Sequence, residues 1–224
     1  MSAAEQQSSP SPPTASLNAP SPAPANPVIA LRSPSSLPAT AHPTIAPPPL
    51  SFLTGTWNVT HSTLPMWKTN KNVKITYTPV AGTSPVHIDD VVTYQGLNST
   101  STKTVHGLDK PFSVTGEQAA AALDADAETT KDVASLGYNW RGKGWLMIAS
   151  SKWEILGYGV EEGTTNEWVV TYFAKTLFTP VGVDFYSRNG KLKEETVVGI
   201  KKALEGLGSE VAKLAKGVFE VGMD

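Results

Sequence analysis

Apolar and polar residues alternate along most of the chain after Gly55, in short segments bounded by Gly, Pro, Asn and Ser. Alternation with a period of two predicts β-strands that bury one face and expose the other. Short connections between successive strands favour an antiparallel meander over βαβ units. The pattern predicts eight strands, at 55–62, 71–79, 87–95, 101–106, 143–150, 152–159, 167–175 and 182–188.

Two segments depart from this alternation. From Leu192 to Leu207 the apolar residues recur at helical spacing, with lysines and glutamates on the opposite face, which predicts an amphipathic helix. Gly208 is placed to end this helix, and a further helical stretch is expected over 210–216. Residues 117–135 are rich in Ala, Asp and Glu, and they fit a mobile loop and a short exposed helix equally well.

Eight antiparallel strands leave two exposed edges unless the sheet closes on itself. Closure into a barrel removes both edges and leaves an interior wide enough for one small ligand. A flat β-sandwich is the competing all-β architecture, but it does not require a long amphipathic helix directly after the last strand. We therefore expect an all-β fold, an eight-stranded antiparallel up-and-down barrel with a C-terminal amphipathic helix.

The first 50 residues differ in composition from the rest of the chain. They hold 13 of the 18 prolines, no Phe, Trp or Tyr, and only two charged side chains, Glu5 and Arg32. A segment so poor in large apolar groups cannot offset its ordering entropy by burial. We expect residues 1–50 to form a disordered Pro-, Ser- and Ala-rich tail, and residues 51–224 to form the barrel domain with its helix.

Net charge and cysteine content narrow the range of partners and compartments. A formal net charge of −2 gives no electrostatic case for nucleic acid and little for an anionic membrane. The absence of cysteine favours a reducing compartment. The chain shows neither a recognisable signal peptide nor an apolar run long enough to span a membrane. These features predict a cytoplasmic protein without a transmembrane segment, and they leave its oligomeric state open.

Two motifs at the ends of the predicted barrel resemble those of a known family. Residues 52–57, Phe-Leu-Thr-Gly-Thr-Trp, resemble the G-x-W motif of the lipocalins, and 185–188, Phe-Tyr-Ser-Arg, resemble the family's closing motif before the helix. The resemblance implies that Arg188 stacks on Trp57 and closes one end of the barrel. The middle T-D-Y-type motif is not evident, and the usual disulfide is absent.

The opening motif also resembles that of a second family, the fatty-acid-binding proteins. Those proteins use more strands and lack the final helix, so the sequence resembles them less well than it resembles the lipocalins. Three other segments, at 64–67, 140–144 and 179–182, resemble lipocalin-like proteins of filamentous fungi.

His61 and Asp184 are the candidate catalytic residues. Counting by two from an inward Trp57 places His61 inside the barrel, where a titratable group can act as an acid, a base or a hydrogen-bond anchor. A neutral histidine with a structural hydrogen bond is the alternative. If Arg188 faces the barrel end, Asp184 shares its face and points inward. The opposite parity buries Phe185 and leaves Asp184 in water.

Aromatic residues with a polar group supply the candidate ligand-binding wall. Tyr and Trp combine an apolar body with one hydrogen-bonding group, which suits an oxygenated hydrophobic ligand, although ordinary strand packing also explains each of them. The candidates are Trp67, Tyr77, Tyr94, Tyr138, Trp153 and Tyr172. The apolar loop 64–67 follows the first strand and is expected to cover the mouth of the barrel as a lid.

The sequence carries no pattern that indicates a metal or a cofactor. Asp89 and Asp90 are adjacent on a predicted strand, so one of them can point inward, but they lack companion ligands at useful spacing. Residues 140–144 contain basic residues and glycines without the pattern of a phosphate-binding loop. We therefore expect no metal ion and no cofactor.

Two functions fit such a barrel. The first is the binding of a small hydrophobic metabolite in the barrel cavity. The second is a cofactor-independent cyclase, isomerase or pericyclase that holds a polyketide or terpenoid intermediate of fungal secondary metabolism in a reactive conformation. Paired inward polar groups would favour the enzyme, and a uniformly apolar lining would favour the carrier. Binding is the first choice, because a fold does not by itself imply catalysis.

Overall fold

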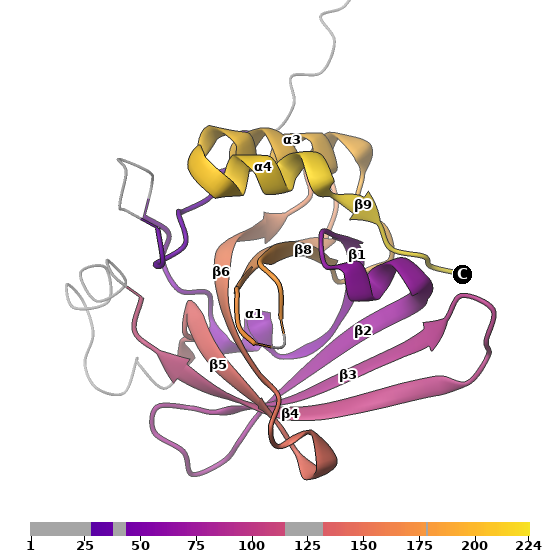
Figure 1. Ribbon diagram of the computed structural model, residues 1–224. Helices are drawn as coiled ribbons and strands as arrows, with labels where there is room; N and C mark the ends of the chain where they lie inside the picture. The colour runs from indigo at the N-terminus through magenta and orange to yellow at the C-terminus, as the bar shows by residue number, and fades with distance from the viewer. Residues whose placement is uncertain (1–27, 38–43, 115–131, 178) are drawn as a thin grey trace, which may run out of the picture.

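The computed structural model describes residues 28–37, 44–114, 132–177 and 179–224. Eight strands form one closed barrel, because each pairs antiparallel with its neighbours along the chain and the first also pairs with the eighth (Figure 1). They are β1 (Gly55–Ser62), β2 (Asn70–Pro79), β3 (Ile88–Gly96), β4 (Thr102–Phe112), β5 (Gly137–Gly142), β6 (Ser150–Val160), β7 (Glu167–Ala174) and β8 (Gly182–Ser187). The predicted eight-stranded up-and-down barrel with a C-terminal helix is confirmed.

Helical segments flank the barrel. Two longer helices pack against each other along one side of the wall, and a short strand that follows them pairs with the upper part of β1 (Figure 1). The helical elements and this strand are α1 (Leu50–Leu53), η1 (Pro65–Thr69), η3 (Gly144–Leu146), α3 (Glu194–Gly206), α4 (Ser209–Gly217) and β9 (Phe219–Glu220). Among the described residues, no helix is both long and apolar enough to cross a membrane.

Apolar side chains form two clusters, one inside the barrel and one between its wall and α3. Trp57 and Tyr186 belong to the inner cluster, whereas Phe185, Val197 and Leu204 belong to the outer one. Successive residues of a strand point to opposite faces, so the neighbours Phe185 and Tyr186 of β8 enter different clusters. The amphipathic helix is therefore needed to cover the apolar outer face of β8.

The end of the barrel at which β1 begins is closed by Arg188. Its guanidinium lies 3.5 Å from the centre of the Trp57 ring, and it donates hydrogen bonds to the backbone carbonyls of Thr56 and Phe52. The Trp57 indole N–H donates to the carbonyl of Leu53 at 2.9 Å. This is the geometry that the lipocalin resemblance implies, and we refer to it as the closed end.

The fifth strand, β5, spans Gly137–Gly142 and so lies earlier in the chain than expected. The predicted strand at 143–150 is therefore wrong. β5 ends at Gly142, and Gly144 then adopts a φ of +62°, a left-handed conformation that interrupts a strand. Met147 and Ile148, which suggested a strand, are exposed in the connection to β6. β4 also continues past the predicted end at 106, as far as Phe112.

Part of the N-terminal segment lies on the outer wall of the barrel. The side chain of Arg32 is buried, and its Nη2 lies 2.7 Å from the Glu154 carboxylate, while its Nε donates to the carbonyl of Ile155 at 2.8 Å. Leu31 fills the space beside Gly157, where a Cβ would lie 2.4 Å from the leucine side chain. Residues 28–37, which we call the strap, therefore differ from the disordered tail expected over 1–50.

Composition does not predict that the strap is ordered, because composition averages over a whole segment. The strap is held on the wall by one leucine, Leu31, and by the buried ion pair of Arg32 with Glu154. Residues 44–50 also contact the barrel, since the Tyr158 hydroxyl donates to the carbonyl of Ala46 at 3.1 Å. Residues 1–27 and 38–43 lie outside the described residues. So does most of 117–135, the segment for which a loop and a helix were equally expected.

Candidate functional site

A β-bulge in β1 decides which side chains of this strand enter the barrel. The pairing of β1 with β8 shifts between Val59 and His61, so the period of two does not continue from Trp57. The buried Ser62 bonds to a side chain of the barrel interior, and the His61 ring lies 5.8 Å from that of Phe185, which belongs to the outer cluster. The predicted inward position of His61 is therefore wrong.

His61 belongs to the outer surface near α3. Burial lowers its pKa, and the neighbouring carboxylate of Glu220 acts in the opposite direction. Lys201 and Glu194 of α3 also influence it, which places the ring between the wall and the helix. Nothing in this arrangement connects His61 to the barrel interior.

Asp184 points into the barrel, on the same face of β8 as Tyr186. It is 1% exposed, and it accepts hydrogen bonds from the Ser62 hydroxyl at 2.5 Å and the Trp67 indole N–H at 3.3 Å. Burial raises its pKa to about 7, although these two donors act in the opposite direction. The parity set by Arg188 thus gives the correct face for Asp184.

Two further buried carboxyl groups lie together nearer the closed end of the barrel, on β3 and β4. Asp109 accepts a hydrogen bond from the Trp153 indole N–H at 2.8 Å, and Asp90 receives one from Trp140. Gly107 makes room for that indole, because a Cβ there would lie 1.9 Å from its nitrogen. One oxygen of each carboxyl group, Asp90 Oδ1 and Asp109 Oδ2, has no hydrogen-bond partner among the described residues.

Burial and mutual repulsion determine the protonation of this pair. Burial raises the pKa of Asp90 to about 7, with a further contribution from Asp89 on the outer face of β3. Burial also raises the pKa of Asp109 well above its usual range, and the charge of Asp90 adds to this effect. Of the two adjacent aspartates considered from sequence, Asp90 is thus the inward one. Asp109 was missed, because β4 was expected to end at 106.

Two tyrosines lie between these carboxyl groups. Tyr186 is influenced by Asp184, and Tyr77 by Asp90 and Asp109, while the two phenols interact with each other. Burial raises the pKa of both phenols well above 10, so both stay protonated and can donate hydrogen bonds. A chain of buried polar groups therefore runs through the barrel interior.

Aromatic rings surround this polar chain. Trp153 stacks between Tyr77 and Tyr138, with ring centres 5.5 and 4.7 Å apart, and Trp67 meets the edge of Tyr94 at 5.7 Å. These five of the six proposed lining residues belong to the inner cluster or pack against it. The sixth, Tyr172, belongs to the outer cluster, where its hydroxyl lies 3.5 Å from that of Ser36 in the strap. Its proposed place in a barrel cavity is therefore wrong.

The loop after β1 covers the mouth of the barrel, and we call residues 64–69 the lid. The side chains of Leu64 and Trp67 are buried, while Met66 points into solvent. The backbone N–H of Leu64 donates to the Ser62 hydroxyl at 2.8 Å, and that hydroxyl donates to Asp184. Both buried residues of the lid are thus linked to Asp184, Trp67 directly and Leu64 through the Ser62 hydroxyl.

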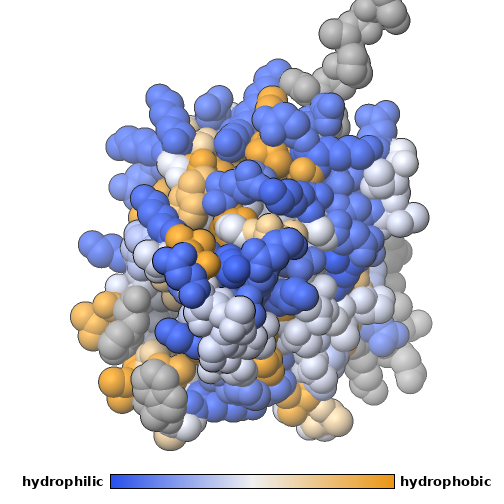
Figure 2. Space-filling view, turned by 90° about the vertical axis from the view of Figure 1, so that its right-hand side faces the viewer, coloured by the Kyte–Doolittle hydropathy of each residue, from blue (hydrophilic) through white to orange (hydrophobic). Residues whose placement is uncertain are grey.

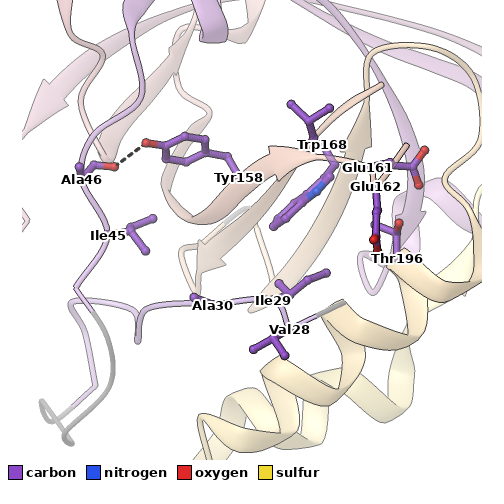
Figure 3. A pocket seen from close by; sticks show the side chains of 11 residues that line it. Val28, Ile29, Ala30, Ile45, Ala46, Tyr158, Glu161, Glu162, Trp168 and Thr196 are labelled. Carbon is purple, nitrogen blue, oxygen red and sulfur yellow. Dashed lines mark hydrogen bonds between the residues drawn. The ribbon is translucent and has the colours of Figure 1, made fainter. Parts of the chain in front are cut away.

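A separate pocket of about 420 Å³ lies outside the barrel, between the strap, β6 and α3 (Figure 3). Its apolar side is formed by Ile29, Ile45 and Trp168. The Glu161 carboxylate at its edge already accepts from the Asn166 amide and from the backbone N–H of Lys193, each at 2.7 Å. The pocket is therefore mainly apolar, and the Glu161 carboxylate at its edge is already used in hydrogen bonds within the protein.

The chemistry available in the interior is acid–base chemistry. Among the described residues, no group of three or more His, Cys, Asp or Glu side chains is arranged to hold a metal ion. Two carboxyl groups with a pKa of about 7 can both give and take a proton at neutral pH.

Comparisons with known proteins find similar solved structures but no match by sequence. No family model matches the chain, and no curated protein matches it. A search of solved structures finds a siderocalin, Ex-FABP, described as functioning through dual ligand specificities. The chain is 10% identical to it with a TM-score of 0.42, over 77% of this chain and 95% of that one. The assignment of the fold accordingly rests on the closed strand order of the chain itself, and the resemblance to fungal proteins stays a prediction.

Proposed function

We propose that the protein binds a small, largely apolar molecule inside the barrel, beneath the lid, with Asp184 as its polar contact. The observation that carries this proposal is the bond between Asp184 and Trp67. A fully buried carboxyl group is held there by a donor from a short surface loop, at a long 3.3 Å. A donor on a ligand can replace that indole when the lid opens.

The surroundings of Asp184 define the ligand class. A carboxylate accepts hydrogen bonds only, so the ligand needs a hydroxyl, amine or amide N–H group. The rings of Trp67, Tyr94 and Trp153 favour a flat apolar body, because aromatic contacts gain from offset stacking. An oxygenated or amine-bearing aromatic or polycyclic molecule meets both requirements.

A fluorescent probe tests this proposal. 1-Aminoanthracene combines a flat apolar body with an amine donor, and we expect it to bind and to change the fluorescence of Trp67. Asp184→Asn should weaken its affinity about 10-fold or more, since a hydrogen bond to a charged group contributes roughly 1.5–3 kcal/mol. Asp89→Asn alters a carboxyl group on the outer face and is the matched control. Equal affinity of both variants and the wild type would contradict the proposal.

A second candidate function, a cofactor-independent isomerase or cyclase, is favoured by the inward carboxyl groups of Asp90, Asp109 and Asp184. Asp90 and Asp184 both have a pKa of about 7, so an acid and a base are available together at neutral pH. A polyketide or terpenoid intermediate held in the interior would be a suitable substrate.

Mass spectrometry of a ligand that co-purifies with the protein separates the two functions. For an enzyme, Asp90→Asn and Asp184→Asn should accumulate a substrate isomeric with the product released by the wild type. For a carrier, wild type and variants should hold the same compound in different amounts. The latter result would remove the enzyme from consideration.

A further inference from the structure

The four connections at the end opposite the closed end share an unusual composition. Because the strands alternate in direction, the connections after β1, β3, β5 and β7 all lie at the mouth, and we call them the mouth loops. They comprise residues 63–69, 97–101, 143–149 and 175–181. They contain three lysines and no acidic residue, whereas the described residues of the connections at the closed end (80–87, 113–114, 132–136, 161–166 and 188–193) include three acidic and three basic residues.

Exposed apolar side chains concentrate at the same end. Of the nine large apolar residues that are exposed in the described part of the chain, five lie in the mouth loops. They are Met66, Leu97, Met147, Ile148 and Leu177, of which Leu177 is 89% exposed and Ile148 76%. Figure 2 shows apolar side chains at its lower left and in smaller groups elsewhere, while polar side chains cover much of the face in view.

Hydrogen bonds hold two of these loops in place. The Thr176 hydroxyl donates to the carbonyl of Ser150 at 3.1 Å, which ties the loop of Leu177 to the loop of Ile148. The Arg141 Nε donates to the carbonyl of Met147 at 2.9 Å. The apolar tips are thus presented together on short, supported turns.

A basic groove of about 730 Å³ runs from these tips down the outer wall of the barrel. It is lined by Lys110, Arg141, Lys143 and Lys152, with Met147 at its rim, and no acidic residue is among those that line it in the described part of the chain. Lys143 also contacts Asp89, and Lys152 lies over the Phe112 ring at 4.2 Å. The groove offers several cationic groups to phosphate oxygens next to an apolar tip.

From this juxtaposition we propose that the mouth loops dock on the surface of an anionic lipid bilayer. The apolar tips enter the headgroup layer, and the basic groove and the loop lysines contact lipid phosphates. Apolar insertion combined with attraction to anionic lipid is the general basis of reversible binding at a membrane surface. Two acidic side chains on this side are already in ion pairs, Asp89 with Lys143 and Asp224 with Lys71 at 2.8 Å, so they oppose this attraction little. The overall charge of −2 conceals this local excess of positive charge.

Flotation of the whole chain with vesicles tests the proposal without knowledge of any ligand of the barrel. Vesicles of phosphatidylcholine alone are compared with vesicles that contain about 30% phosphatidylserine. We expect binding to the anionic vesicles at least about 10-fold stronger, and its loss in about 0.5 M salt, because salt screens exposed charges. Equal binding to both vesicles, or to neither, would overturn the proposal.

Surface variants locate the docking face. Met147→Asp combined with Ile148→Asp should abolish binding, whereas Val160→Asp, at an exposed apolar residue near the closed end, should leave it unchanged. Lys175→Glu and Lys110→Glu should each weaken binding about 5-fold or more, and Lys202→Glu on α3 should not. Circular dichroism checks that each variant is folded.

A partner of another kind would give a different set of results. If no vesicle binds and the Met147→Asp, Ile148→Asp variant instead changes the sedimentation coefficient of the free protein, the mouth loops form an interface between copies of the chain. If the mouth variants bind anionic vesicles like the wild type, another surface is responsible. Either result contradicts the proposal.

Discussion

The two ends of the barrel each present a tryptophan, but they hold it by different contacts. At the closed end the Trp57 indole donates to the backbone of Leu53 at 2.9 Å, and Arg188 covers its ring. At the mouth the Trp67 indole donates to Asp184 at 3.3 Å from a lid of one short turn. One contact is fixed by backbone and cation–π geometry, whereas the other depends on a carboxyl group that changes protonation near neutral pH. Stability is thus concentrated at the closed end and adaptability at the mouth.

Removal of the strap should have the largest effect, because the strap supports the barrel wall towards the closed end. A chain that begins at Pro49 lacks Leu31 and Arg32, so it exposes the apolar wall beside Gly157 and removes the ion-pair partner of Glu154. The burial lost costs about 1.5–3 kcal/mol for each large apolar side chain. Thermal unfolding should therefore shift down by roughly 10 °C.

A chain that begins at Val28 is the matched control, since it keeps the strap and should melt like the full chain. Arg32→Met should reproduce much of the loss, and the addition of Glu154→Gln should restore part of it by removing the unpaired charge. If the chain from Pro49 is as stable as the full chain, the strap is dispensable, as its composition alone suggests.

The pH dependence of stability should follow the carboxyl groups of the interior. Asp90 and Asp184 titrate at about 7 in the folded protein, well above the value near 3.9 of an unfolded aspartate. Between these values the folded state holds protons that the unfolded state has released. The free energy of unfolding should therefore fall as pH rises from about 4 to about 7, by up to about 4 kcal/mol for each group.

Asp184→Asn should flatten this slope in part, leaving the contribution of Asp90 and Asp109. Asp89→Asn, on the outer face, should reduce the slope only slightly, because its charge makes the smaller contribution to the raised pKa of Asp90. Urea unfolding at several pH values measures both. A stability that rises steadily from pH 4 to pH 7 in the wild type would contradict the burial of these groups.

Trp57 and Arg188 should be energetically coupled. A double-mutant cycle with Trp57→Phe and Arg188→Ala isolates their interaction, which we expect at about 1–2 kcal/mol for a desolvated cation–π pair. Strict additivity of the two changes would mean that Arg188 closes the barrel end through its bonds to backbone carbonyls alone.

A smaller effect on stability is expected at the mouth. Trp67→Phe keeps the apolar lid but removes the donor to Asp184, so its cost should stay within about 1 kcal/mol. Hydrogen exchange of the indole N–H should be faster for Trp67 than for Trp57. Slower exchange at Trp67 would reverse the contrast between the two ends.

The barrel could be predicted from sequence because its signals are local and repeated. Alternation gives most of the strands, but it leaves two parities open for Asp184, and only the parity set by Arg188 is correct. His61 could not be placed in the same way, since one extra residue in a bulge reverses every later side chain of β1. The apolar run that includes Met147 and Ile148 predicts a strand, because apolar runs usually indicate burial. These two side chains are instead exposed in a loop at the mouth.

Other features depend on contacts that no local pattern encodes. Arg32 is buried only because Glu154 of β6, far from it in the chain, lies beneath it on the outer wall. Asp109 enters the site because Gly107 and Pro111 do not end β4, although both residues usually weaken strands. Both are long-range consequences of the closed barrel.

The most direct test of ligand binding beneath the lid compares both ends in one experiment. Each of the six tryptophans contributes one indole N–H signal to a ¹H–¹⁵N spectrum, and the variants Trp67→Phe and Trp57→Phe assign two of them. On titration with 1-aminoanthracene, the signal of Trp67 should shift to saturation while the signal of Trp57 stays in place. If Trp67 stays in place while Trp168, in the pocket outside the barrel, shifts instead, the ligand binds outside the barrel and the account is contradicted.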